Sequence, residues 1–284
     1  MSEVEVRRMP RDELDVAIER AASEGWNPGP HDAECFWAID PEGFFMGVVD
    51  GRVIGRAMAV AYDDHFAFCG LYIVEPEYRG LGHGMAITRA RLDHVGDRNA
   101  GIDGVVAMCD KYMRLGYRTA HRSIRFGFTP PPDFGDPGAT DVPIRAAAEV
   151  PFDALLGYDA RHFPARRESF LKLWISRPNA TALVAGDGDT ITGYGVLRTC
   201  RTGAKIGPLF ADDAATAEAL FRALCARGAG APVFMDIPEP NTRAMDMARR
   251  YHMTSEFECA RMYLRGDPGL PLGNIYGITT FEAG

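Results

Sequence analysis

The segment from Val74 to Gly84, with the sequence VEPEYRGLGHG, constrains the fold more than any other part of the chain. It follows the apolar run 67–73 and precedes a segment of helical character, so we predict a strand, a tight loop and a helix. A helix begins with about four backbone N–H groups that lack partners, and its dipole places partial positive charge there. Arg79 adds a guanidinium fork that suits phosphate oxygens. Three glycines keep side chains out of the loop, namely Gly80, Gly82 and Gly84. The segment therefore predicts a pyrophosphate-binding site.

The order V-x-P-x-x-R-G-x-G-x-G resembles the acyl-CoA signature of the GNAT superfamily of N-acyltransferases. The central element of that signature is R-x-x-G-x-G/A, which Arg79, Gly82 and Gly84 fill without a gap. The resemblance implies that an acyl-CoA, first of all acetyl-CoA, binds at this loop. The alternative is a glycine-rich connector that binds nothing. The cofactor-binding residues that the resemblance implies are Ile73, Val74, Arg79, Gly80, Leu81, Gly82, His83 through its backbone N–H, and Gly84.

Length and composition exclude several classes of protein. The 284 residues suffice for one large domain or two of ordinary size. A net charge of -8, with no stripe of Lys and Arg interleaved with aromatics, argues against a nucleic-acid partner. The chain shows no apolar run long enough for a bilayer and no leader, so we expect a cytoplasmic protein without membrane contact. The six cysteines are scattered without a CxxC, which favours buried thiols over disulfides or a metal site.

Two parts of the chain repeat one order of elements. Segments 45–60 and 182–197 each read as two strands joined by an Asp-Gly turn, and each precedes a further strand, a helix and another strand. The proline-rich segment 129–138 cannot form a helix or a central strand, so we place a boundary there. We predict two tandem GNAT-like α/β (α+β) domains, residues 1–134 and 135–284, each with a mixed, mostly antiparallel sheet flanked by helices.

The second copy lacks the residues that would bind a pyrophosphate. Asp212 and Asp213 place carboxylates at the predicted helix start, where they cap the helix and repel an anion. We therefore expect a degenerate second domain and one acyl-CoA site, in residues 1–134. The positions of Arg79, Gly80, Gly82 and Gly84 become Ala211, Asp212, Ala214 and Thr216 in the second copy.

The expected reaction is attack of an amine on an acyl thioester. Deprotonating an alkyl ammonium of pKa ~10.4 costs roughly 4.6 kcal/mol at neutral pH, and the departing thiolate benefits from an acid. Tyr112 lies four residues before Gly116, which matches the family pattern Y-x-x-x-G-F/Y. The resemblance implies that Tyr112 protonates the thiolate. The alternative is a tyrosine that packs its ring and exposes its hydroxyl. The resemblance also implies an oxyanion site where the fourth strand splays, near Ile73 and Val74.

The general base stays open at this stage, because segment 67–74 contains no carboxylate or histidine. A water relay to Asp40, Glu42 or Glu75 is one alternative. The apolar segment 275–284 offers another, in which the terminal carboxylate enters the active site; an edge strand is the simpler reading of that segment.

The acceptor site is expected beside the loop 25–32, which lies next to the acceptor in GNAT folds. Trp26 can form an aromatic wall for a cation, or can anchor the loop in the core. We take Trp26, Asp32 and Tyr72 as the substrate-contacting residues.

These patterns predict an acyl-CoA-dependent N-acyltransferase acting on a small-molecule amine, with a protein amine as a further option. One rival is a dinucleotide-binding oxidoreductase, but the loop is GxGxG and not GxGxxG. The other rival is a non-catalytic acyl-CoA sensor or scaffold. No motif indicates the oligomeric state.

Overall fold

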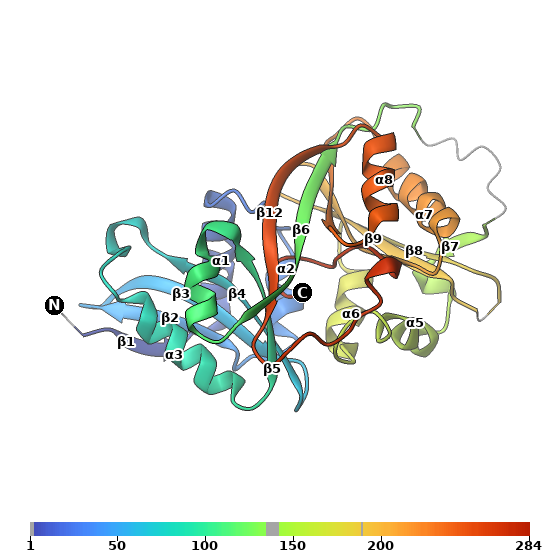
Figure 1. Cartoon of the computed structure of the whole chain (residues 1–284). Coiled ribbons are helices and arrows are strands. Elements are labelled where there is room, and N and C mark those ends of the chain that lie inside the picture. Colours follow the sequence, from blue (N-terminus) through green and yellow to red (C-terminus); the bar gives the residue numbers. More distant parts are fainter. Residues whose placement is uncertain (1–2, 135–141, 189) are drawn as a thin grey trace.

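The protein forms one continuous sheet that runs through both halves of the chain (Figure 1). The computed structural model describes residues 3–134, 142–188 and 190–284. Within these residues, 13 strands join in the order β1-β2-β3-β4-β5-β12-β6-β11-β10-β9-β8-β7, and β13 lies beside β10. The pairs β4–β5 and β10–β11 are parallel, and the other pairs of described strands are antiparallel.

The first half follows the predicted order of elements. Its hairpin turns at Asp50 and Gly51, whose φ angles of 49° and 76° are those of a tight two-residue turn. Short 3-10 turns follow β4 and β5, at Pro76–Tyr78 and Val106–Met108. Its elements are β1 (Glu5–Arg8), α1 (Arg11–Ser23), α2 (Asp32–Trp37), β2 (Phe44–Val49), β3 (Arg52–Ala61), β4 (Phe66–Val74), α3 (Gly84–Val95), β5 (Asn99–Val105), α4 (Cys109–Arg114) and β6 (Arg118–Phe128).

The second half repeats this order and ends with an additional short strand. Short 3-10 turns lie at Ala147–Glu149 and Leu272–Asn274. The fold class predicted from the sequence, two GNAT-like copies of mixed α/β structure, is confirmed. The elements are β7 (Ile144–Ala146), α5 (Phe152–Asp159), α6 (Glu168–Ser176), β8 (Ala180–Ala185), β9 (Gly193–Thr199), β10 (Ala204–Ala211), α7 (Ala214–Arg227), β11 (Val233–Pro238), α8 (Thr242–Arg250), β12 (Thr254–Tyr263) and β13 (Ile275–Gly277).

The two halves exchange their long strands β6 and β12, which the sequence did not predict. Strand β12 of the second half lies between β5 and β6, and β6 of the first half pairs with β11. Figure 1 shows both strands running from one half into the other. Neither half thus completes its sheet from its own residues. Part of the predicted boundary segment, residues 135–141, lies outside the described residues, and the division at residues 134 and 135 stays a prediction.

A shared hydrophobic core joins the halves on one face of the sheet. Phe36 of α2, Phe68 of β4 and Trp174 of α6 belong to one buried cluster, and the rings of Phe36 and Trp174 lie 6.4 Å apart. Burial of each such side chain stabilises the fold by about 1.5–3 kcal/mol. On the opposite face, α3 and α4 cover the first half and α7 and α8 cover the second. The halves are thus held by a common core as well as by shared strands.

No described helix combines the length and the apolar character that a membrane crossing requires.

Candidate active site

The glycine loop lies between the end of β4 and the start of α3, as predicted. Gly80 and Gly82 adopt φ angles of 79° and 82°, which other residues rarely reach. No side chain in the described part of the chain caps α3, and the first turn of α3 contains no acidic residue. The Nε of Arg79 donates to the carbonyl oxygen of Val74 (2.8 Å), and its Nη2 donates to Glu24 (2.5 Å). The loop thus presents open amides and a half-exposed guanidinium together.

Strands β4 and β5 separate beside this loop. Their parallel pairing covers only Phe66 to Cys69 against Asn99 to Ile102. Leu71, with a φ of 47°, lies in a bulge where the register of β3 and β4 shifts. Beyond the bulge β4 stays paired with β3 alone, whereas β5 continues with β12. The splay that the sequence analysis expected near Ile73 therefore begins earlier, directly after Cys69.

A cavity of about 630 Å³ occupies the space between the separated strands. It connects the glycine loop to the strand split and to Tyr112. Nine of the residues predicted to bind cofactor or substrate line it: Trp26, Tyr72, Ile73, Val74, Arg79, Gly80, Gly82, Gly84 and Tyr112. Three others do not, namely Leu81, His83 and Asp32. Leu81 is 48% exposed, and the ring of His83 lies 6.2 Å from that of Tyr78 at the loop.

Tyr112 of α4 lies against β5 and lines this cavity. A Cβ at Gly104 of β5 would approach the ring carbons of Tyr112 to 2.8 Å, so this position of the ring requires a glycine at residue 104. Burial raises the pKa of Tyr112, although the nearby Arg91 opposes the shift. The phenol therefore keeps its proton at neutral pH, as a general acid requires.

Tyr72 and Trp26 border the cavity on different sides. The hydroxyl of Tyr72 lies close to Gly84, where a Cβ would approach it to 2.1 Å, so Tyr72 faces the helix start. Trp26 lies between the halves, and its carbonyl oxygen accepts hydrogen bonds from Arg125 (2.9 Å) and Lys205 (3.0 Å). Tyr72 thus lies on the loop side, and Trp26 on the side where the halves meet.

Comparison with protein families agrees with this geometry. Residues 11–117 match a family described as "Acetyltransferase (GNAT) family", and residues 155–277 match one described as "Acetyltransferase (GNAT) domain". The chain is a tandem GNAT acyltransferase. The dinucleotide-binding alternative is wrong, because the sheet is mostly antiparallel and both halves match GNAT families.

The similarity to known proteins covers nearly the whole chain. A holothin acyltransferase of Pseudoalteromonas sp. (strain SANK 73390) is 26% identical over 274 residues, which is 96% of this chain and 92% of that protein. A solved structure from Pyrococcus horikoshii, described as "A Putative Acetyltransferase", shares the fold, with a TM-score of 0.84, 20% identity and coverage of 100% of this chain and 97% of that chain. A tandem GNAT protein from the clavulanic acid biosynthesis pathway has a TM-score of 0.61, 15% identity and coverage of 94% and 99%.

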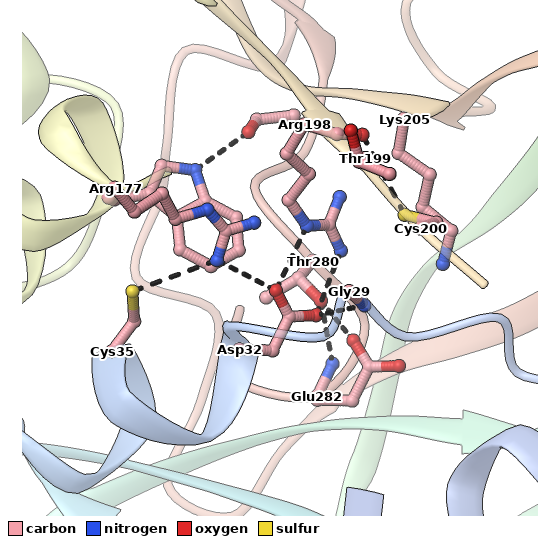
Figure 2. A network of polar contacts seen from close by, with 12 residues as sticks. Gly29, Asp32, Cys35, Arg177, Arg198, Thr199, Cys200, Lys205, Thr280 and Glu282 are labelled. Atoms are coloured by element: carbon pink, nitrogen blue, oxygen red, sulfur yellow. Dashed lines mark hydrogen bonds and ion pairs between the residues drawn. The ribbon is translucent and has the colours of Figure 1, made fainter. Parts of the chain in front are cut away.

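The C-terminal segment of this tandem GNAT enters the cavity of the first half. The segment is not the edge strand that the sequence favoured: only Ile275–Gly277 forms a strand, and Phe281 and Glu282 line the cavity. Glu282 is 3% exposed and accepts a hydrogen bond from the hydroxyl of Thr280 (Figure 2). The chain end is fixed by Tyr62, whose hydroxyl donates to the carbonyl oxygen of Ala283 (2.7 Å). A side-chain carboxylate, rather than the terminal one, therefore lines the cavity.

The same segment fills the corresponding split of the second half. Strands β10 and β11 pair only over Ala204 to Ile206, and β13 then pairs with Leu209 and Phe210. At the helix start that follows, Asp213 accepts a hydrogen bond from the amide of Thr216 (2.8 Å). A protein strand and a capping carboxylate thus occupy the space that remains open in the first half.

Asp32 is a structural residue and does not reach the cavity. It is fully buried and accepts hydrogen bonds from Arg177 (2.8 Å) and Arg198 (3.3 and 3.4 Å), which belong to the second half (Figure 2). Burial alone would raise the pKa of Asp32, but the two guanidinium groups lower it to about 2. The sequence assigned Asp32 to the acceptor because the loop 25–32 was expected to lie beside it. In the structure the carboxylate of Asp32 is instead paired with two arginines of the second half.

The three carboxylates considered for a water relay do not line the cavity either. Asp40 accepts hydrogen bonds from His94 (2.7 Å) and from the amide of Ala61 (3.0 Å). Glu75 is paired with Arg56 (2.9 Å), and Glu42 lies near Arg8 at the surface. Sequence reasoning missed Glu282, although a single carboxylate within an otherwise apolar C-terminal segment was a usable signal.

Proposed function

We propose that this chain is an acyl-CoA-dependent N-acyltransferase that moves an acyl group, acetyl in the simplest case, to the primary amine of a small molecule. One observation carries the proposal: a single cavity is lined by the glycine loop, by the split between β4 and β5, and by Tyr112. A loop for pyrophosphate, an opening for an extended arm and an acid at its inner end are the parts that the reaction needs. The strand split of the second half is filled, and this half instead contributes residues to the acceptor side of the cavity.

The glycine loop and Arg79 hold the diphosphate in this proposal. The amides of the loop and the guanidinium supply positive potential without a competing carboxylate in the first turn of α3. The unpaired edge of β4 beyond Cys69 provides backbone N–H groups for the thioester oxygen. Tyr112 gives its proton to the sulfur as the C–S bond breaks.

Glu282 takes the proton of the acceptor amine. It is a buried carboxylate that lines the cavity, and no ion pair to it occurs among the described residues. An acceptor ammonium would supply the missing charge, and the aromatic rings of Trp26, Phe257 and Phe281 would enclose it. Three cations act on Glu282 electrostatically, and each is bonded elsewhere: Arg125 to Asp236, Arg198 to Asp32, and Lys205 to the carbonyl oxygen of Trp26.

The comparisons support a small-molecule acceptor. The relative that covers almost the whole chain is described as a holothin acyltransferase. The cavity is partly enclosed by the C-terminal segment, which leaves more room for a small amine than for a folded protein chain.

The test is release of free thiol from acetyl-CoA with a panel of small amines, amino sugars, polyamines and peptides. We expect turnover with at least one small amine, and a loss of about 10²–10⁴ in kcat for Tyr112→Phe with CoA still bound. Tyr251→Phe is a matched control, because Tyr251, the residue after α8, does not line the cavity and its hydroxyl donates to Glu218 of α7 (2.7 Å). Bound CoA without turnover on the whole panel would favour the sensor, as would a Tyr112→Phe variant with unchanged behaviour.

A further inference from the structure

Arg91 is a buried cation in the wall of the cavity. It lies on α3, two turns beyond the glycine loop, and is only 3% exposed. Its side chain lines the cavity together with Tyr72 and Tyr112. Neither the family signature nor the proposed mechanism assigns it a task.

Among the described residues, the guanidinium of Arg91 has no anionic partner. Its Nε and Nη1 are buried and form no hydrogen bond within the described part of the chain, and no ion pair to Arg91 occurs there. The guanidinium lies 4.7 Å from the ring centre of Tyr72, a cation–π contact worth roughly 0.5–2 kcal/mol. Burying an unpaired charge costs several kcal/mol, so this contact compensates only part of it.

The two tyrosines on which Arg91 acts electrostatically are neutral, and Asp103, a carboxylate that lines the same cavity, is paired with Arg261 (2.7 Å). Burial raises the pKa of Tyr112 on α4, and it also raises the pKa of Tyr117, whose hydroxyl donates to the sulfur of Cys69 on β4 (3.5 Å). A cation in a cavity wall, surrounded by aromatic rings and protonated hydroxyls, is arranged for an anion that comes from the cavity. After burial, Arg91 has the largest effect on the pKa of Tyr112, which it lowers.

We propose that Arg91 stabilises the CoA thiolate as it leaves, an inference that rests on the proposed acyl transfer. The amine nitrogen forms a bond to the thioester carbon, and the C–S bond breaks with its electron pair going to sulfur. The amine proton goes to Glu282, and Tyr112 transfers its proton to the sulfur and regains one from solvent. As the C–S bond breaks, negative charge builds up on the sulfur until Tyr112 protonates it, and Arg91 lines the same cavity as this acid and acts on it electrostatically.

The experiment titrates the thiol of CoA bound to the intact protein, by ultraviolet absorbance of the thiolate. Complexes with desulfo-CoA, which lacks the sulfur, provide the spectrum that is subtracted for the tyrosines. We expect the bound thiol of the wild type to titrate about one pH unit or more below that of Arg91→Met, a tenfold change in thiolate fraction at a given pH. The preference for CoA over desulfo-CoA at alkaline pH should fall by a similar factor in Arg91→Met.

Arg89→Met is the matched control, because Arg89 is an exposed arginine on the same helix; we expect it to titrate like the wild type. Arg91→Lys keeps the charge and should keep the lowered thiol pKa, which provides a test if Arg91→Met does not fold. Equal titration of wild type and Arg91→Met, with CoA bound to both, overturns the proposal. So does a variant that changes only the preference for succinyl-CoA over acetyl-CoA, since Arg91 would then bind the acyl group. Failure of the wild type to bind CoA would instead contradict the proposed function itself.

Discussion

The backbone of Gly70 in β4 packs directly against the backbone of Glu282 in the C-terminal segment. A Cβ on residue 70 would lie 1.9 Å from the carbonyl oxygen of Glu282, so the two backbones are in direct contact. The absence of a side chain on β4 lets the end of the second half approach the strand split of the first. The carboxylate that β4 lacks is thereby supplied from the other half of the molecule.

Gly70→Ala should displace the C-terminal segment. The added methyl group meets backbone, which cannot rotate away, so we expect a loss of about 1–3 kcal/mol in the free energy of unfolding and a large loss of acyl transfer. Urea unfolding and kcat/KM measure the two effects. Gly157→Ala is the control: Gly157 lies in α5 with no atom near its Cβ position, so alanine there should stabilise by about 0.5–1 kcal/mol. Equal effects of the two substitutions would contradict the contact.

Glu282→Gln should lower kcat about 10²–10³-fold, because the amide keeps the shape of the carboxylate but accepts no proton from the amine. The KM for acyl-CoA should change little, since Glu282 lies on the acceptor side. Steady-state kinetics with saturating acyl-CoA measure this. Glu256→Gln, an exposed position on β12, should behave as the wild type. An unimpaired Glu282→Gln enzyme would exclude Glu282 as the proton acceptor.

Arg79→Gln should raise the KM for acyl-CoA about 10- to 100-fold, since a charge-assisted hydrogen bond to phosphate contributes roughly 1.5–3 kcal/mol. The effect should weaken at high salt, because Arg79 is 47% exposed. Isothermal titration with CoA gives the same quantity without turnover. Arg249→Gln, whose exposed arginine pairs with Asp246 on α8, is the control and should bind CoA normally.

Asp32→Asn should destabilise the protein by about 3–5 kcal/mol, because it leaves Arg177 and Arg198 buried beside a neutral group. The folded pKa of about 2 lies below the ordinary value of 3.8, so Asp32 stabilises the fold above the higher value. That contribution disappears as the pH falls through the lower value. Chemical unfolding at neutral and acidic pH should show that the difference in the free energy of unfolding between wild type and variant becomes smaller as the pH falls. Asp246→Asn, on an exposed pair, should show no such gap.

Local patterns predicted the parts of the site that adjoin each other in sequence. The loop 79–84 needs glycines, a helix start without a cap and a preceding strand, and the residues that indicate all three lie close together in the sequence. Tyr112, which lines the cavity, could be proposed from the sequence because its spacing to Gly116 is local as well. Asp32 was misassigned because its partners, Arg177 and Arg198, stand far away in the chain, and no local pattern reveals a buried ion pair of that kind.

The sequence by itself determined that there are two copies of one fold, that the first has a glycine-rich loop before a helix and that the second has aspartates in its place. Only the tertiary structure decided how the copies combine: β6 and β12 change places, and the last residues fill the split of the second half and reach Gly70 in the first. The physical reason is the range of the interactions. Turn geometry and helix capping act over a few residues, whereas strand pairing and the pairing of buried charges join residues that only the folded chain brings together.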